Sequence, residues 1–213
     1  MKNSIIVFLF FCAGCLLGFS GEIKLDAHHI SLYILYALML QVGISIGSNK
    51  NLKQIVRQIR LKMLVIPLAT IIGTLLFSAL ASLLLSRWSV FECMAVGSGF
   101  AYYSLSSILI TQFKEPSIGL QLATELGTIA LLSNIIREMM ALLGSPLIEK
   151  YFGKLAPISA AGVNSMDVVL PSMDVVLPAI TRYSGKEMIP VAILHGILID
   201  FSVPLFVSFF CSL

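Results

Sequence analysis

Charged residues are scarce in this sequence. Only 12% of its 213 residues are Asp, Glu, Lys or Arg, while 58% are hydrophobic and the mean hydropathy is +0.97. A soluble domain has about 25% charged residues, so this chain could not cover its surface in water. The sequence also lacks a basic stripe interleaved with aromatic residues, so nothing in it indicates a nucleic-acid partner.

Cysteine is scarce as well, with four residues. Cys12 and Cys15 form a C-x-x-C pattern, but both lie in an apolar stretch without a nearby histidine or second cysteine pair. Such cysteines are typical of a packed core rather than of metal or redox chemistry. We therefore expect no metal and no cofactor.

Long apolar runs are abundant instead. Each is close to the roughly 20 residues that a helix needs to cross about 30 Å of hydrocarbon. The pattern predicts an all-α, polytopic helical membrane protein, with residues 1–213 as a single transmembrane domain. It contains about six to seven membrane segments, including broken or re-entrant helices. The predicted segments are 4–19, 29–48, 64–85, 91–111, 117–144 and 188–210, and the stretch 156–180 either crosses or re-enters.

Basic residues indicate how the chain is oriented. The first run follows Lys2 and is similar to a signal peptide, but because more membrane segments follow, a retained first span is favoured. The loop 50–62 has five Lys or Arg residues and no acid, so it should be cytoplasmic, and with it the N-terminus. The same reasoning places residues 87–92 at the outer surface and 114–116 in an inner turn.

Two stretches are unusually polar for the membrane interior. Residues 97–107 read Gly-Ser-Gly-Phe-Ala-Tyr-Tyr-Ser-Leu-Ser-Ser, which fits either close helix packing or a locally opened helix lining a polar cavity. Residues 165–178 contain Ser-Met-Asp-Val-Val-Leu-Pro twice, with Asp167 and Asp174 as the two acids. The prolines of this repeat interrupt a helix, so both stretches are candidates for broken segments.

Ionisable residues inside two predicted segments mark a candidate site. Burying one such charge costs about 2.5–3.5 kcal/mol on insertion scales, so it needs a partner or a function. Asn134 and Glu138 are four residues apart and share a helix face, with Arg137 beside them. Arg137 either locks helices through a carboxylate pair or belongs to a site in which Glu138 is the foremost acid. Asp200 lies in the middle of the last segment.

These motifs resemble, in order and spacing, the bacterial lysine exporter family LysO. The resemblance implies a secondary transporter of the inner membrane that exports L-lysine and toxic analogues, by proton antiport, with Glu138 on the family's intramembrane acid. The motifs are 97–107, Asn-Ile-Ile-Arg-Glu at 134–138, Ser-Met-Asp-Val-Val-Leu-Pro at 165–171, and His195-Gly196 with Pro204.

Three departures from the family pattern stand out. Family members carry a further N-terminal membrane portion. Either a small separate membrane polypeptide supplies it, which we expect, or this chain works differently, for example as a homo-oligomer. The Ser-Met-Asp motif is doubled, which leaves open whether Asp167 or Asp174 serves. Asp200 is an acid that the family pattern does not include.

A site for lysine follows from the resemblance and the positions together. Glu138 and one of the two doubled aspartates would meet the ammonium groups, and hydroxyls and amides would line the carboxylate end. A proton would compete with the substrate at Glu138. The candidate substrate- or proton-binding residues are Glu138, Asp167, Asp174, Asn134, Arg137, Ser104, Ser106, Asn164, Asp200 and His195.

Two other classes were weighed against a transporter. An intramembrane serine protease would need Gly-x-Ser-Gly around Ser98, but Val96 stands where the first glycine belongs. An aspartyl protease needs its acids on separate helices, whereas Asp167 and Asp174 belong to one repeat. The sequence therefore indicates a non-enzyme. The remaining alternative is a membrane subunit that assembles with a transporter without transporting.

Overall fold

The computed structural model is helical throughout the part that it describes, which confirms the predicted all-α class. The chain divides into two units, Met1–Tyr36 and Ala37–Leu213, and all elements named below belong to the second. The predicted segments 4–19 and 29–48, the loop 50–62 and both doubled aspartates lie largely or wholly outside the described residues. The structure describes residues 33, 36, 37, 40, 44, 61–166 and 184–213.

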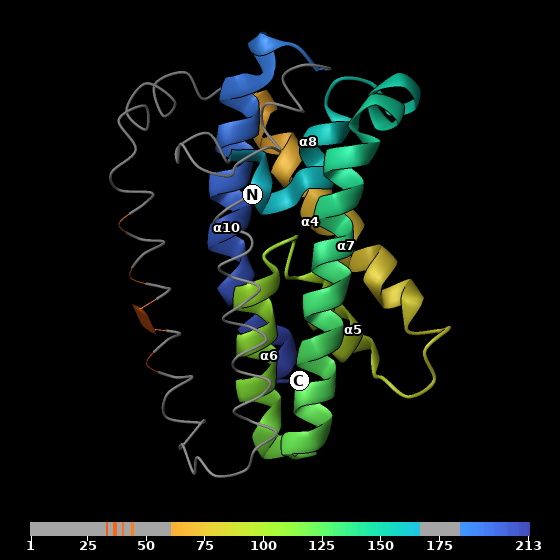
Figure 1. The fold of residues 1–213 in the computed structure, drawn as a ribbon, viewed down its shortest axis with the longest axis vertical. Helices are drawn as coiled ribbons and strands as arrows, with labels where there is room; N and C mark the ends of the chain where they lie inside the picture. The colour runs from red at the N-terminus through yellow and green to blue at the C-terminus, as the bar shows by residue number, and fades with distance from the viewer. Residues whose placement is uncertain (1–32, 34–35, 38–39, 41–43, 45–60, 167–183) are drawn as a thin grey trace, which may run out of the picture. The chain divides into compact units, whose positions relative to one another are not determined.

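Three of the helices are long and apolar enough to cross a membrane: Met63–Ala81, Leu120–Phe152 and Ile189–Cys211. The predicted total of six to seven segments includes residues outside the described ranges and stays a prediction. Figure 1 shows the elements in space. They are α4 (Leu61–Ala81), α5 (Val90–Gly97), α6 (Tyr103–Ile118), α7 (Leu120–Phe152), α8 (Ala156–Ala161), η1 (Gly162–Met166), η2 (Lys186–Met188) and α10 (Ile189–Cys211).

Helices α4 and α10 agree with the predicted segments 64–85 and 188–210. Helix α7 does not end where the sequence predicts, because it continues through Pro146 for 33 residues in all. Proline removes one backbone N–H donor and disturbs the preceding turn. The hydroxyl of Ser145 donates to the carbonyl of Ala141 in that turn, a local bond of the kind that lets membrane helices tolerate proline.

The predicted segment 91–111 is two helices rather than one. Helix α5 has only eight residues, which is about 12 Å and less than half of the hydrocarbon thickness. Phe100 and Ala101 then take left-handed backbone conformations, with φ of 44° and 75°, before α6 begins at Tyr103. Of the two interpretations of this polar stretch, the structure therefore shows the opened helix.

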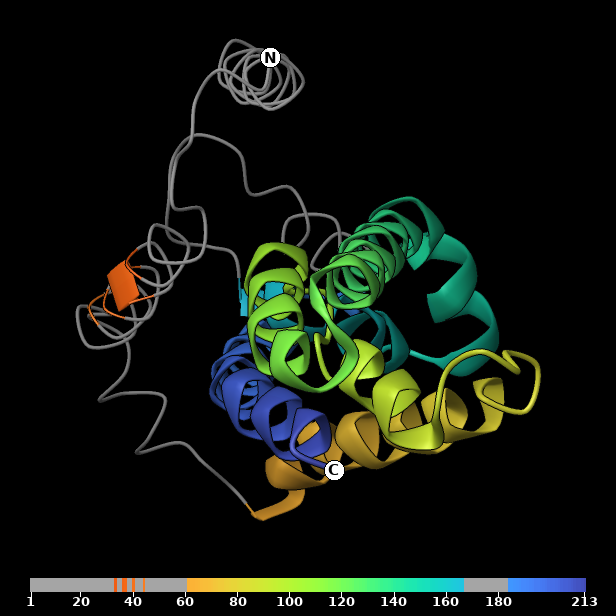
Figure 2. The same ribbon diagram turned by 90° about the horizontal axis from the view of Figure 1, so that it is seen from below.

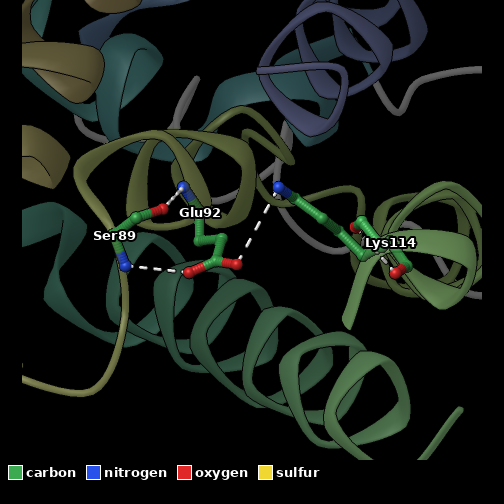
Figure 3. Close-up of polar contacts among 4 residues, drawn as sticks. Ser89, Glu92 and Lys114 are labelled. Atoms are coloured by element: carbon green, nitrogen blue, oxygen red, sulfur yellow. Dashed lines mark hydrogen bonds and ion pairs between the residues drawn. The ribbon is translucent and has the colours of Figure 1, made fainter. Parts of the chain in front are cut away.

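The chain reverses at this break, so α5 and α6 form a re-entrant hairpin. Near the open end of the hairpin, Nζ of Lys114 on α6 lies 3.8 Å from Oε1 of Glu92 on α5, and both side chains are largely buried. Figure 3 shows this pair together with Ser89, whose hydroxyl and backbone N–H bond reciprocally to Glu92 at the start of α5. The placement of residues 87–92 and 114–116 on opposite sides is thus wrong.

At the other end of the bundle, the starts of α4 and α10 pack around α8. Ile158 and Ala161 of α8 are buried against Ala141 of α7 and Ala192 of α10, and Met63 packs on the same cluster. Lys154 and Glu187 form an exposed ion pair at 3.1 Å there. A hydrogen bond from the backbone of Glu187 and, after it, this contact with Lys154 hold the pKa of the Glu187 carboxyl below the usual range. We call this the α8 end and the opposite one the hairpin end.

A labelling experiment tests the hairpin. Arg87 and Ser117 are exposed on either side of it, and Lys154 is exposed at the α8 end. Single cysteines at 87 and 117, in a chain without its native cysteines, should react with a membrane-impermeant thiol reagent from the same side. A cysteine at 154 should react from the opposite side. Labelling of 87 and 117 from opposite sides would show a continuous helix instead.

Candidate functional site

Two interrupted stretches of backbone meet between the ends of the bundle. The break after α5 enters from the hairpin end, and α8 with η1 enters from the α8 end (Figure 1). The N–H of Val163 donates to the carbonyl of Phe100 at 3.0 Å, which joins them directly. Gly162 allows this approach, because a Cβ on it would lie 2.1 Å from that carbonyl oxygen. Irregular backbone at membrane depth occurs only where protein buries it or a cavity adjoins it.

Asn134 on α7 holds the first break in place. Its Oδ1 accepts the N–H of Ala101 at 2.7 Å, and its Nδ2 donates to the carbonyl of Ala130 at 2.8 Å. Longer contacts join Nδ2 to the Val96 carbonyl, at 3.3 Å, and to the Ser106 hydroxyl, at 3.4 Å. Asn134 and Ala101 are buried, so these bonds supply partners that water cannot.

Arg137 lies one turn further along α7 and reaches the second break. Its Nε and one terminal nitrogen donate to the carbonyls of Ala160 and Ser159, both at 3.1 Å, near the end of α8. The other terminal nitrogen donates to the Thr74 hydroxyl at 3.2 Å, and the guanidinium carbon lies 5.8 Å from the centre of the Phe100 ring. Within the described structure its hydrogen-bond acceptors are neutral oxygens, so the alternative of a helix-locking carboxylate pair finds no support there.

His195 is fully buried on α10 and bonded through both ring nitrogens. Nδ1 lies 2.9 Å from the hydroxyl of Ser165, which itself donates to the Ala192 carbonyl. Nε2 lies 3.0 Å from the hydroxyl of Thr70 on α4, which in turn contacts Ser159 of α8 at 2.7 Å. The histidine thus links α4, α10 and the second break.

Two predicted residues hold buried polar atoms without a partner in the described part of the chain. They are Oδ1 of Asp200, whose residue is 3% exposed, and Nδ2 of Asn164 in η1. A buried polar group without a hydrogen bond costs about 1–3 kcal/mol, and native structures contain few of them. Oδ1 of Asp200 can therefore accept a hydrogen bond from a proton-bearing group, and Nδ2 of Asn164 can donate one to a ligand, at no cost in existing bonds.

The remaining predicted residues have different surroundings. Glu138 is half-buried on α7 next to Arg137, and Ser104 is half-buried near the start of α6. Ser106 is buried and contacts Asn134, so it supports the break rather than lining an open site. Glu125, another acid of α7, forms an ion pair with exposed Arg87 at 2.9 Å. Asp167 and Asp174 lie outside the described residues.

Sequence reasoning missed the threonines of α4. Thr70 and Thr74 are four residues apart, so they share a helix face, and they contact His195 and Arg137 respectively. That spacing is the only signal that could have identified them. Among the described residues, no group of three or more His, Cys, Asp or Glu side chains could hold a metal ion.

A cavity of about 320 Å³ adjoins the site between α4, α5 and α7. A more open one, of about 590 Å³, lies between α4 and α8, and Arg137 lines both. Sites for small molecules typically measure about 300–1,000 Å³. Seen from below in Figure 2, α10 lies beside α4 and α6, and α7 lies on the other side of α6.

The arrangement defines a class of protein. Helices that break near the middle of a membrane bundle, with polar groups gathered at the breaks, are the construction that secondary transporters use for their binding sites. Comparison with known sequences gives the family. The model of the family described as Lysine exporter LysO matches residues 8–173 and 171–211, so this chain belongs to that family. The two matches meet at 171–173, inside the doubled motif.

Two curated relatives bear related names. Lysine exporter LysO of Escherichia coli (strain K12) is 32% identical over 204 residues, which are 93% of this chain and 61% of the relative. The chain therefore spans about three fifths of that protein. A putative lysine exporter of Haemophilus influenzae is 28% identical over 185 residues, 85% of this chain and 84% of the relative. No solved structure matches.

Proposed function

We propose that this chain is part or all of a secondary transporter that exports L-lysine and its analogues across the bacterial cytoplasmic membrane. The observation that carries the proposal is the meeting of two helix breaks beside Arg137 and Glu138 in a member of the LysO family. Two relatives with exporter names support the substrate class. An assembly subunit that does not transport would need no meeting of two helix breaks lined by polar groups in its interior.

In this proposal Glu138 binds an ammonium group of the substrate. Glu138 is half-buried and follows Arg137 directly. Water screens a half-buried charge less than an exposed one, so a carboxylate and an ammonium attract more strongly there. Asp167 or Asp174 supplies the second carboxylate, since both follow η1 within the doubled motif. A proton that competes with lysine for Glu138 would couple export to proton entry, because one carboxylate cannot hold both.

Asp200 is a second candidate for the proton. It lies on α10 with an unpartnered, buried Oδ1 in the described structure, and it is five residues from His195. Ionisable side chains at this depth commonly serve proton relays.

Orientation and assembly follow as further proposals. If the basic loop 50–62 is cytoplasmic, so are the N-terminus and the α8 end, where α4 begins. The E. coli relative has additional length without a counterpart in these 213 residues. A small membrane polypeptide or a second copy of the chain could supply the corresponding part, and co-purification from native membranes would recover it.

Substitution of Glu138 tests the function. In cells without their own lysine exporter, the wild-type chain should confer thialysine resistance and export lysine. Glu138→Gln should lower export about tenfold or more, because the amide keeps the shape and loses the charge that binds the ammonium. Export of labelled lysine from preloaded cells is the measurement.

Glu125→Gln is the matched control. This acid is on the same helix, but its side chain is 39% exposed and paired with exposed Arg87, so export should stay near the wild-type rate. Wild-type export by an inserted Glu138→Gln variant would remove the role given to Glu138. Absence of lysine export by the wild-type chain, with its assembly partners present, would remove the proposed function.

A further inference from the structure

The structure assigns a role to the cavity of about 320 Å³ between α4, α5 and α7. We propose that Arg137 and the hydroxyls around it form a subsite for the α-carboxylate of an amino acid, an inference that rests on the proposed transport function. The polar lining of the cavity consists of Thr74, Ser78, Ser133, Asn134 and Arg137.

The guanidinium of Arg137 is fixed in place and still has donors to offer. It carries five N–H groups. The bonds described to Ala160, Ser159 and Thr74 use one donor on each of its three nitrogens. Within the described structure, this leaves one donor on each terminal nitrogen, and a carboxylate can accept from both terminal nitrogens of a guanidinium.

Charge also favours an anion at this position. The acceptors that the structure gives Arg137 are two carbonyls and a hydroxyl, which satisfy hydrogen bonds without supplying a full negative charge. A positive charge in a mostly apolar cavity is stabilised by a carboxylate and repels an ammonium. A dibasic amino acid would therefore enter with its carboxylate towards Arg137.

The apolar lining suits the remainder of such a ligand. The rest of the lining is mostly aliphatic and aromatic side chains, which can cover the methylene chain of a long amino acid. Glu138 follows Arg137 directly and lies on the same helix, so an acid for an ammonium group is close at hand. The apolar lining includes Ala81, Leu85, Trp88, Val96, Leu126 and Ile129.

The test compares three ligands of the purified chain, together with any assembly partner that co-purifies with it from native membranes. L-lysine has the α-carboxylate, lysinamide has a neutral amide in its place, and cadaverine lacks the group. Binding is measured by calorimetry or by thermal shift. The wild-type protein should bind L-lysine roughly 10- to 100-fold more tightly than either analogue, the range expected for a charge-assisted pair. Arg137→Gln should bind all three within about threefold of one another.

A second variant serves if Arg137→Gln does not fold. Thr74→Val keeps the side-chain size and removes the hydroxyl that accepts from Arg137, so lysine binding should weaken a few-fold while cadaverine binding stays unchanged. Thr128→Val is the matched control, because Thr128 is exposed on α7 and, in the described structure, its hydroxyl bonds to the Thr124 carbonyl of its own helix. It should leave the binding of all three ligands unchanged.

Each outcome decides the question. The subsite is overturned if the wild-type chain binds lysinamide or cadaverine as tightly as lysine, or if a folded Arg137→Gln or Thr74→Val variant keeps the full preference for the carboxylate. If the chain prefers another amino acid over its amide, the subsite stands and the assignment of lysine fails. If no amino acid binds, both fail, and a cavity that holds only lipid would give that result.

Discussion

Gly162→Ala should abolish transport, because the added methyl group separates the two helix breaks. The new Cβ would lie 2.1 Å from the carbonyl oxygen of Phe100, and this oxygen is backbone, so it cannot rotate away. Gly162 also has a φ of 61° and a ψ of −128°, a conformation that costs an alanine about 1–3 kcal/mol. The bond from Val163 to Phe100 would then lengthen or break.

Gly73→Ala is the control for this substitution. Gly73 lies within α4, and no atom is within 4 Å of the position of its Cβ. Alanine favours a helix over glycine by about 1 kcal/mol, so this variant should be as stable as the wild type or slightly more so. Lysine export and the unfolding temperature of the purified protein are measured for both. Normal export by Gly162→Ala would show that transport does not depend on the close contact between the two helix breaks.

Asn134→Ala should be the most destabilising of the polar substitutions. It leaves the N–H of Ala101 and the carbonyl of Val96 without the partner that Asn134 provides. The N–H is fully buried, and a buried unsatisfied group costs about 1–3 kcal/mol. The lost contacts to Ala130 and Ser106 add to this. We expect a clear fall in unfolding temperature together with loss of export.

Two further variants isolate the capping role. Asn134→Asp keeps an acceptor for Ala101 but loses the donors to Val96 and Ala130, so its stability should be intermediate. Gln121→Ala removes an exposed amide from the same helix and should change the unfolding temperature little. If Asn134→Ala unfolds at the wild-type temperature, the break is held by other contacts.

The sequence was sufficient to predict α4 and α10 and insufficient to predict the course of the chain between them. Apolar length predicts α4 and α10, because hydrocarbon thickness sets the number of residues needed. The break after α5 depends on left-handed conformations at Phe100 and Ala101, which are rare for residues with a side chain and have no sequence signature. A single helix over 91–111 predicts that α6 leads to the side opposite the start of α5, whereas α6 returns to the same side. The predicted side of the turn at 114–116 is therefore wrong.

The candidate site was predicted in part for a similar reason. Asn134, Arg137 and His195 stood out because polar residues are costly at membrane depth. Threonine does not stand out, because its hydroxyl can bond to its own helix, as Thr70 does to the Ile66 carbonyl. Which of these groups contact one another follows from where the helices break, and composition does not give that.

The hairpin of α5 and α6 also fixes on which side the chain ends. A segment that returns to the side it entered leaves the parity of crossings unchanged. Among the described elements, α4, α7 and α10 are the helices long enough to cross, and three crossings place the C-terminus opposite the start of α4. If the basic loop 50–62 is cytoplasmic, a reporter fused after Leu213 emerges outside the cytoplasm. A fluorescent protein that matures only in the cytoplasm would stay dark there, whereas alkaline phosphatase would be active.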